Sequence, residues 1–374
     1  MNPTTLYIFN PEHDYALAHD SDHFVPLQSA LRFAKECAPF LRHLFGDIHI
    51  FCPYDTPTLD LSELSFDHIQ PWGWDRLIRQ QLRNAGVSES LLPSDSELDQ
   101  LRNLAHRKMS IQAMEFLHEA CPAMIYPPAA RLLTDIDMVE SFVKEQGECI
   151  FKSPYSGNGR GNLYAHGELT PTLRRQCTGV LRRQKALLGE PLLNVVQDFA
   201  MEFHCTPQKV DFVGYSLFQT LHYGYAGNEL RSDSDIEKIL GQWVNHQQLE
   251  SVRTALIAFM EREIQPHYQG CVGVDMFVYR ENDDFRLNPM VEINLRMTMG
   301  MAAHKIYLQH VHPHSIGTMQ LEYRPKPGDL QQFVAQQPAM TYQDNRWHEG
   351  FLALTPIDKK TQYAITVKIV SLRP

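Results

Sequence analysis

The sequence predicts an α/β protein in which short strands and amphipathic helices alternate through several lobes. Residues 6–9 and 48–51 are short apolar runs, and residues 28–45 between them have the apolar spacing of a helix. Strand, helix and strand in this order form a βαβ unit. At 374 residues the chain is too long for one ordinary core, which predicts two or three domains or lobes.

The first predicted strand runs into a polar loop, residues 10–23, which contains three histidines and three aspartates. Ligands bind at the carboxyl ends of strands in open α/β sheets, so this loop is a candidate substrate site. A metal cluster and a solvated loop are the alternatives, although the spacing matches no zinc pattern. The later histidines at 310, 312 and 314 are expected to mark a loop beyond the catalytic lobe.

Local signals predict the elements that follow. Ser94 and Glu97 have the spacing of a capping box, so a helix is expected to begin there. Apolar periodicity predicts further helices over 105–117, 136–144, 172–188 and 249–264. Apolar runs predict strands at 149–152, at 192–205 with a break into a short connector, and at 210–221, and a hairpin around residues 358–361.

The composition narrows the class of protein. A hydrophobic content of 43% with 21% charged residues is typical of a globular protein, and a net charge of −10 argues against general binding to nucleic acids or anionic membranes. The seven cysteines are scattered without a CxxC pair, as in a reducing compartment. No signal peptide or spanning apolar stretch is recognised. The sequence therefore predicts a cytoplasmic protein.

Residues 271–300 predict a β-hairpin that carries acidic side chains. Residues 271–279 alternate as a strand, 280–284 are polar, and 287–294 return as a second strand. If the hairpin is symmetric about Asp283 and Asp284, then Asp275 lies opposite Glu292. A bulge at Pro289 would shift this register.

Asn294 shares the face of Glu292, because residues two apart on a strand point to the same side. Two carboxylates and an amide oxygen then converge, and such hard oxygen ligands suit Mg²⁺. Val274, Met276, Val291 and Ile293 surround these acids with apolar side chains, which favours a site over a solvated hairpin. The solvated hairpin with ordinary surface acids is the alternative.

A glycine-rich segment follows a strand that ends in Lys152. Glycines stand at alternate positions, 157, 159 and 161, so the backbone can fold closely over an anion. The segment matches neither a Walker loop nor GxGxxG, and a flexible turn is the alternative.

Together these segments resemble the ATP-grasp superfamily over roughly residues 104–305. In that family an Asp on one strand faces Glu-x-Asn on the next, often continued as Glu-x-Asn-x-Arg, which is found here as Glu292-Ile-Asn294-Leu-Arg296. The resemblance implies that Asp275, Glu292 and Asn294 hold one or two Mg²⁺ ions on the phosphates of ATP, with Mn²⁺ as a substitute.

The resemblance also implies roles at the nucleotide. Arg107, or Lys108 in its place, reaches the phosphates from a helix start, Lys152 contacts the α- and β-phosphates, and the glycine-rich segment closes over the γ-phosphate. The resemblance implies that the predicted connector contacts adenine and that Glu202 binds the ribose hydroxyls. Without the resemblance, Glu202 would be an ordinary carboxylate on a strand. The expected ATP-binding residues are Arg107, Lys152, Ser156, Gly157, Gly159, Arg160, Gly161, Gln197, Asp198, Phe199, Glu202 and Val291.

The implied organisation is an ATP-grasp fold of two α+β lobes preceded by a βαβ-type domain. The expected parts are an N-terminal substrate-side domain (1–103), a small lobe with the glycine-rich segment (104–190), a large lobe with the metal hairpin (191–317) and a β-rich C-terminal extension (318–374).

The implied activity is that of an ATP-dependent carboxylate–amine, or thiol, ligase that acts through an acyl-phosphate. Its partners would be small-molecule carboxylates and amines, and a homodimer is left open. Arg296, on the face of Asn294, and Lys152 would be catalytic, with Arg296 holding the carboxylate or the oxyanion. A packing role for Arg296, a small-molecule kinase of the same fold, and a non-catalytic ATP-binding module are the alternatives.

Overall fold

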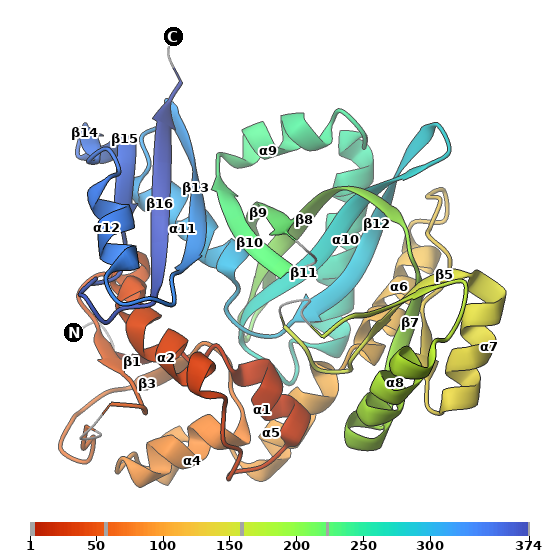
Figure 1. Ribbon diagram of the computed structural model, residues 1–374, viewed down its shortest axis with the longest axis horizontal. Helices are drawn as coiled ribbons and strands as arrows, with labels where there is room; N and C mark the ends of the chain where they lie inside the picture. Colours follow the sequence, from red (N-terminus) through yellow and green to blue (C-terminus); the bar gives the residue numbers. More distant parts are fainter. Residues whose placement is uncertain (1–3, 56–58, 158–160, 222–223, 373–374) are drawn as a thin grey trace.

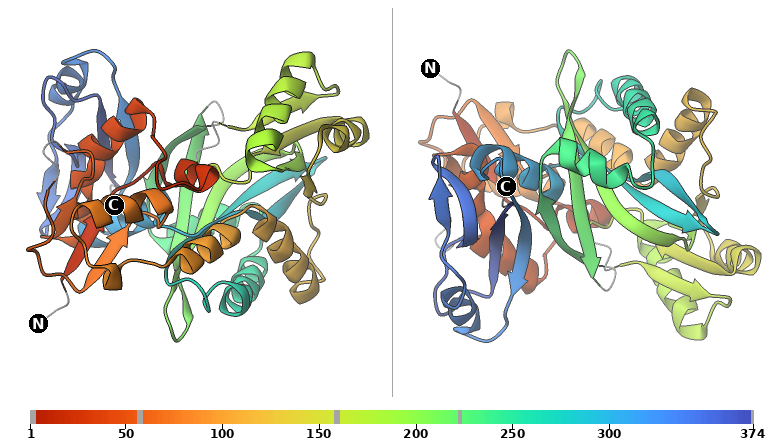
Figure 2. Two further views of the ribbon diagram at one scale, coloured as in Figure 1. Left: turned by 90° about the horizontal axis from the view of Figure 1, so that it is seen from below. Right: turned by 90° about the horizontal axis from the view of Figure 1, so that it is seen from above.

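The computed structural model describes residues 4–55, 59–157, 161–221 and 224–372 (Figure 1). The described residues form three sheets, of three, nine and four strands. Figures 1 and 2 show the C-terminal strands at one end of the molecule and the four-stranded sheet with α7 and α8 at the other.

The N-terminal sheet is parallel, in the order β2-β1-β3. It confirms the predicted βαβ unit, because the helical segment lies between the paired strands β1 and β2. Around the sheet lie α2, the short helix η1, α3, α4 and η2. The bounds are β1 (Thr5–Ile8), α2 (Gln28–Cys37), η1 (Ala38–Phe40), α3 (Leu41–Phe45), β2 (His49–Phe51), β3 (His68–Pro71), α4 (Arg76–Asn84) and η2 (Glu89–Leu91).

The expectation of a loop over residues 10–23 is wrong in part, because α1 (His13–His19) lies within it. The helix has no side-chain N-cap. Tertiary packing holds it instead, since Ala16 and Leu17 are buried, and Asp20 ends it in the left-handed conformation.

The small lobe is an antiparallel sheet in the order β4-β7-β5-β6, packed against α7 and α8. Its bounds are β4 (Arg131–Leu133), α7 (Ile136–Gln146), β5 (Glu148–Lys152), β6 (Leu163–His166), α8 (Pro171–Gln184) and β7 (Leu187–Pro191). The helix predicted over 172–188 is too long at its C-terminal end. Lys185 adopts φ of 67°, which stops α8, and Leu187 begins β7 instead.

The nine-stranded sheet runs in the order β12-β11-β8-β9-β10-β13-β16-β15-β14. The bounds are β8 (Asn194–Cys205), β9 (Val210–Leu221), β10 (Gly224–Leu230), β11 (Gly270–Glu281), β12 (Asp284–Asn294), β13 (Ser315–Tyr323), β14 (Thr341–Gln343), β15 (Arg346–Ala353) and β16 (Tyr363–Ser371).

Two expectations for this sheet have different outcomes. The predicted break inside 192–205 is wrong, because β8 is one strand from Asn194 to Cys205, with a bulge at Val196 where its pairing to β11 shifts by one residue. The connector from β7 is the dipeptide at 192–193. The predicted C-terminal hairpin is confirmed, since β15 and β16 are antiparallel neighbours. The four-part division of the chain stays a prediction, and its 317/318 boundary falls inside β13.

The remaining helices link or cover these sheets. The predicted capping box at Ser94 and Glu97 is confirmed at the start of α5. The bounds are α5 (Asp95–Leu104), α6 (Lys108–Ala120), α9 (Asp233–Leu240), α10 (His246–Glu263), α11 (Met299–His310) and α12 (Asp329–Ala335).

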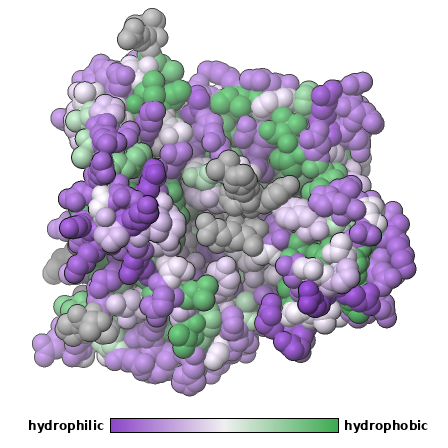
Figure 3. Space-filling model, in the orientation of Figure 1, coloured by the Kyte–Doolittle hydropathy of each residue, from purple (hydrophilic) through white to green (hydrophobic). Residues whose placement is uncertain are grey.

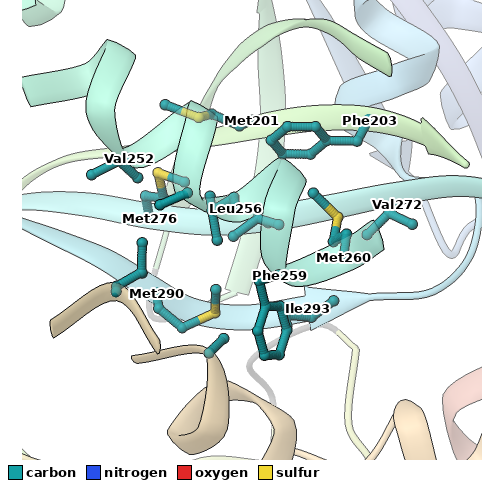
Figure 4. Packing of buried hydrophobic residues seen from close by; sticks show 14 of the residues in the cluster. Met201, Phe203, Val252, Leu256, Phe259, Met260, Val272, Met276, Met290 and Ile293 are labelled. Atoms are coloured by element: carbon teal, nitrogen blue, oxygen red, sulfur yellow. The ribbon is translucent and has the colours of Figure 1, made fainter. Parts of the chain in front are cut away.

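The largest core lies between α10 and one face of β8, β11 and β12 (Figure 4). Met276 and Ile293 of the hairpin point into it, and each is less than 10% exposed. Because side chains alternate along a strand, the neighbouring Asp275 and Glu292 point to the opposite face. The core therefore fixes which face of the hairpin is polar.

The described part of the chain has no helix that is both long and apolar enough to cross a membrane. On the face drawn in Figure 3, hydrophilic residues surround the hydrophobic ones over most of the coloured surface.

Candidate active site

The predicted pairing of Asp275 with Glu292 is confirmed, but by a different route from the one assumed. The turn is centred one residue earlier than expected, at 282–283, where Asn282 adopts φ of 56°. Near the turn the register pairs Phe277 with Asn288, and a bulge in β12 over residues 289–291 shifts it by two. The bulge thus compensates for the displaced turn and restores the expected pair.

The three predicted metal ligands lie together. Nδ2 of Asn294 donates to Oδ2 of Asp275 at 3.3 Å, and Asp275 lies opposite Glu292 across the hairpin. Burial and the neighbouring Glu292 raise the pKa of Asp275, and burial also raises the pKa of Glu292 against the opposing effect of Arg107. Two half-buried carboxylates and an amide oxygen on adjacent strands are a donor set that fits Mg²⁺.

Arg107 connects this trio to the glycine-rich segment. Its Nη2 lies 2.9 Å from Oε2 of Glu292 and donates to the carbonyl oxygen of Ser156 at 2.7 Å. Its Nε donates to the carbonyl oxygen of Ser153 at 2.8 Å. Nη1 of Arg107 is buried without a hydrogen-bond partner among the described residues, so this guanidinium has a donor to spare for a phosphate oxygen.

Lys152 lies at the end of β5, where its Nζ is 2.6 Å from Oε2 of Glu190. Both side chains are largely buried, with exposures of 7% and 14%. Glu190 was not anticipated from sequence, because only the antiparallel pairing of β5 with β7 brings it to Lys152. The one feature of the sequence that could have indicated Glu190 is its position directly before Pro191, at the end of a strand.

Arg296 is held by α1 of the N-terminal domain. Its Nη2 lies 3.1 Å from Oδ2 of Asp14, its Nε donates to Oδ1 of Asp14 at 3.3 Å, and Nη2 also donates to Asn294 at 2.9 Å. Burial alone would raise the pKa of Asp14, but the guanidinium of Arg296 lowers it below its ordinary value. The candidate substrate segment thus reaches the site through an ionised Asp14.

These groups line one small cavity. His13 and Asp14 contribute to it from α1, Ser156 from the glycine-rich segment, and Glu292 and Arg296 from β12 and the residues after it. Its volume is about 10 Å³, which is room for a single water molecule. The lobes are therefore closed on one another in this conformation.

Glu202 lies on β8, the strand next to the hairpin in the same sheet, and is 1% exposed. Thr298, the N-cap of α11, donates a hydrogen bond of 2.9 Å to its Oε2. Glu202 pairs with Gly273 of β11, and a Cβ at Gly273 would lie 3.0 Å from Oε2 of Glu202. Burial raises the pKa of Glu202 to about 8, so the carboxyl holds its proton at neutral pH. Its contact with a ribose stays a prediction.

The other predicted nucleotide residues lie in several places around the sheet and the glycine-rich segment. Gln197 and Asp198 pair with Val278 and Phe277, and Thr220 donates a hydrogen bond of 3.0 Å to Asp198. Phe199 is fully buried in the core. The remaining positions are Val291 in the bulge, Gly157 against Asp14 and the exposed Gly161, whereas Gly159 and Arg160 lie outside the described residues.

No protein-family model matches this sequence, and a search of curated proteins gives no match. Solved structures of ATP-grasp enzymes do match it. The N5-carboxyaminoimidazole synthetase of Staphylococcus aureus, in complex with ADP, is 12% identical with a TM-score of 0.51, over 99% of this chain and 93% of that one.

Two further solved structures agree. Biotin carboxylase of Campylobacter jejuni, in a β,γ-ATP complex, is 14% identical with a TM-score of 0.54, over 99% of this chain and 88% of that one. The N5-carboxyaminoimidazole synthase of Aspergillus clavatus, with ADP and 5-aminoimidazole ribonucleotide, is 12% identical with a TM-score of 0.53, over 99% and 95%. The chain has the ATP-grasp fold, as predicted from its sequence.

Proposed function

We propose that the protein is an ATP-dependent carboxylate–amine ligase that works through an acyl-phosphate. The observation that carries this proposal is the convergence of the Asp275, Glu292 and Asn294 trio with Arg107 and Arg296 around one cavity. The solved structures with the same fold include enzymes in complex with ADP or ATP, which supports a nucleotide site here.

The residues have distinct parts in this proposal. The trio would hold Mg²⁺, Arg107 and Lys152 would neutralise phosphate charge, and the glycine-rich segment would cover the transferred group. Mg-ATP supplies the γ-phosphoryl group. The acceptor carboxylate is already ionised at neutral pH, so no base is required for its attack on phosphorus.

Arg296 would receive the acceptor carboxylate. The guanidinium of Arg296 now donates hydrogen bonds to Asp14 and Asn294. An incoming carboxylate would therefore replace the carboxylate of Asp14. A planar guanidinium binds carboxylates through two parallel hydrogen bonds, which also sets the angle of the acyl group.

Hydroxylamine tests the proposal. The protein is incubated with Mg-ATP, hydroxylamine and pools of amino acids and small carboxylates, while ADP, phosphate and hydroxamate are measured. We expect hydroxamate with at least one carboxylate, since hydroxylamine attacks acyl-phosphates. Asn294→Ala, which lacks the amide oxygen of the trio, serves as the matched inactive variant.

The two rival functions predict other products. ADP together with a stable phosphorylated alcohol, and no hydroxamate with any carboxylate, would show a kinase. Nucleotide binding without turnover against every pool would show a binding module. Either result overturns the ligase proposal.

A further inference from the structure

His13 and Asp75 form a buried dyad beside the cavity. Nδ1 of His13 lies 3.0 Å from Oδ2 of Asp75, and both residues are 2% exposed. Asp75 is itself fixed, because its Oδ1 accepts the backbone N–H of Ile78 at 2.9 Å and its Oδ2 accepts from Asn10 at 3.2 Å. With both oxygens accepting, Asp75 faces His13 as an acceptor. Nδ1 then carries the proton and Nε2 keeps its lone pair.

The ring of His13 is held in one orientation. It lies against Gly73, where a Cβ would come within 2.6 Å of Nε2, so only glycine leaves space for the ring. Nε2 makes no hydrogen bond within the described parts of the chain, and His13 lines the same cavity as Asp14 and Arg296. The ring of His13 is therefore beside the position proposed for the acyl group.

The second step of the proposed reaction needs a base. An alkyl amine is protonated at neutral pH and has no lone pair with which to attack an acyl-phosphate. A positioned imidazole is the side chain that most often takes such a proton, and a carboxylate behind it fixes its tautomer and stabilises the imidazolium.

We propose that His13, oriented by Asp75, is the general base for the amine substrate. This inference rests on the ligase function proposed above. The ammonium passes one proton to Nε2, and the freed lone pair on nitrogen attacks the acyl carbon. The C–O bond to phosphate then breaks, and the leaving phosphate takes the second proton from nitrogen and departs as hydrogen phosphate, which leaves the neutral amide. The imidazolium later returns its proton to solvent, so atoms and charges balance.

The surroundings of His13 suit a transient imidazolium. The charged or acidic groups near it are Asp75 from the start of α4, Glu12 and Asp14 beside it on the chain, and Arg296, which is paired with Asp14. Burial raises the pKa of Glu12 to about 7, so Asp75 is the carboxylate that contacts the ring and stabilises the imidazolium as it forms.

Two kinds of nucleophile distinguish a base role of His13 from the roles of the other residues in the site. Hydroxylamine is mostly unprotonated at neutral pH and needs no base, whereas ammonium and primary alkylammonium ions do. With a carboxylate that gives hydroxamate, wild type and His13→Gln are compared using hydroxylamine, ammonium chloride and a set of primary amines. His19→Gln, on the exposed end of the same helix, is the matched control.

We expect His13→Gln to form hydroxamate within about threefold of wild type and to lose amide formation by about 100-fold or more. Amide formation by the variant should recover as pH rises, because the free amine becomes more abundant. Equal retention of both products overturns the base role and leaves the ligase intact. Parallel loss of both products shows a structural role and overturns it too. No hydroxamate with wild type overturns both proposals.

Asp75→Asn provides a second measurement that does not depend on substrate. Asparagine can still cap α4, but its amide nitrogen then faces Nδ1, which moves the ring proton to Nε2. Nitrogen NMR of protein labelled at histidine should show His13 with Nδ1–H in wild type and Nε2–H in the variant. An Nε2–H tautomer in the wild type contradicts the proposal.

Discussion

At the scale of single residues, the burial of Glu202 makes the stability of the folded protein depend on pH. Its pKa is about 8 in the folded protein, against an ordinary value of 4.5. Between these two values the folded state holds a proton that the unfolded chain has released. Stability is therefore full below pH 4.5 and falls as the pH rises toward 8.

Glu202→Gln should remove this pH dependence. We expect the free energy of unfolding of wild type to fall between pH 5 and pH 8 by roughly 3–5 kcal/mol more than that of the variant. Urea unfolding at a series of pH values measures this difference. Glu119→Gln, at an exposed position on α6, is the control and should follow wild type. Parallel curves for wild type and Glu202→Gln would show that the carboxyl is ionised in the folded protein.

Arg296→Lys addresses the acceptor site. We expect ATP affinity to stay close to that of wild type while hydroxamate formation falls by about 100-fold to 1,000-fold, because lysine cannot make two parallel bonds to a carboxylate. Calorimetric titration with ATP and the hydroxamate assay give the two readings. Full activity in the lysine variant would assign Arg296 to packing.

Site residues could be predicted from the sequence where their positions depend on nearby residues, but not where they depend on partners far along the chain. Glu292 and Asn294 could be predicted to share a face, because side chains alternate along a strand. The pairing of Asp275 with Glu292 was correct only because the bulge compensates for the displaced turn. Lys152 could be found at its strand end, but Glu190 could not, since their meeting depends on how β5 and β7 pair.

The same limit applied to the N-terminal residues. Their histidines and aspartates stood out, yet the pairing of Asp14 with Arg296 spans 282 positions. No local pattern encodes which arginine an aspartate reaches across two lobes.

At the scale of elements, the contact between α1 and the glycine-rich segment depends on Gly157. A Cβ at this position would overlap Oδ2 of Asp14 and lie 3.0 Å from Nη2 of Arg296. At Gly161, in the same segment, a Cβ would meet nothing within 4 Å. The two glycines therefore offer a matched pair of substitutions.

Gly157→Ala should move the segment away from α1 and lower the rate of ATP turnover, by about 10-fold to 100-fold if reacting groups shift by an ångström. Gly161→Ala should stay near wild type. Steady-state ADP release measures both variants. Removal of the overlapping carboxylate in Asp14→Ala/Gly157→Ala should restore the rate of ATP turnover that is lost in Gly157→Ala. Equal loss in the two glycine variants would rule out the contact as the cause.

Element boundaries depended on signals of unequal strength. The capping box at Ser94 gave the start of α5 correctly. The end of α8 was missed because Lys185, which adopts the left-handed conformation there, is neither Gly nor Asn. The helix α1 was missed because seven residues rich in His and Asp form a helix only when packed against the rest of the protein.

At the scale of the whole molecule, binding of substrates must separate parts that now touch. The cavity has a volume of about 10 Å³, which is room for one water molecule. Sites for small molecules have volumes of several hundred cubic ångströms. The four-stranded sheet has no strand pairing with the nine-stranded one among the described residues. The N-terminal domain is tied to the hairpin by the hydrogen bond of 2.9 Å from Met297 N to Trp72 O. Separation of the four-stranded sheet from the nine-stranded one would therefore break no strand pairing among the described residues.

Mg-ATP should stabilise the folded protein by binding between these parts. At 100 times its dissociation constant a ligand adds about 2.7 kcal/mol, which should raise the melting temperature by several degrees. Glu292→Gln should reduce the shift, because one metal ligand and the ion pair with Arg107 are lost. Glu281→Gln, at the far end of the hairpin, is the control. A melting temperature that millimolar Mg-ATP does not change would contradict the nucleotide site.

The bulge in β12 has a consequence for how this hairpin can change over evolution. Side chains alternate with a period of two, so the loss or gain of one residue between the turn and Glu292 exchanges the two faces. Glu292 and Asn294 would then enter the methionine-rich core, and Ile293 would enter the site. Changes of two residues preserve the faces. Unless a further bulge absorbs it, an odd insertion would destroy the site and the core together, whereas an even one keeps both.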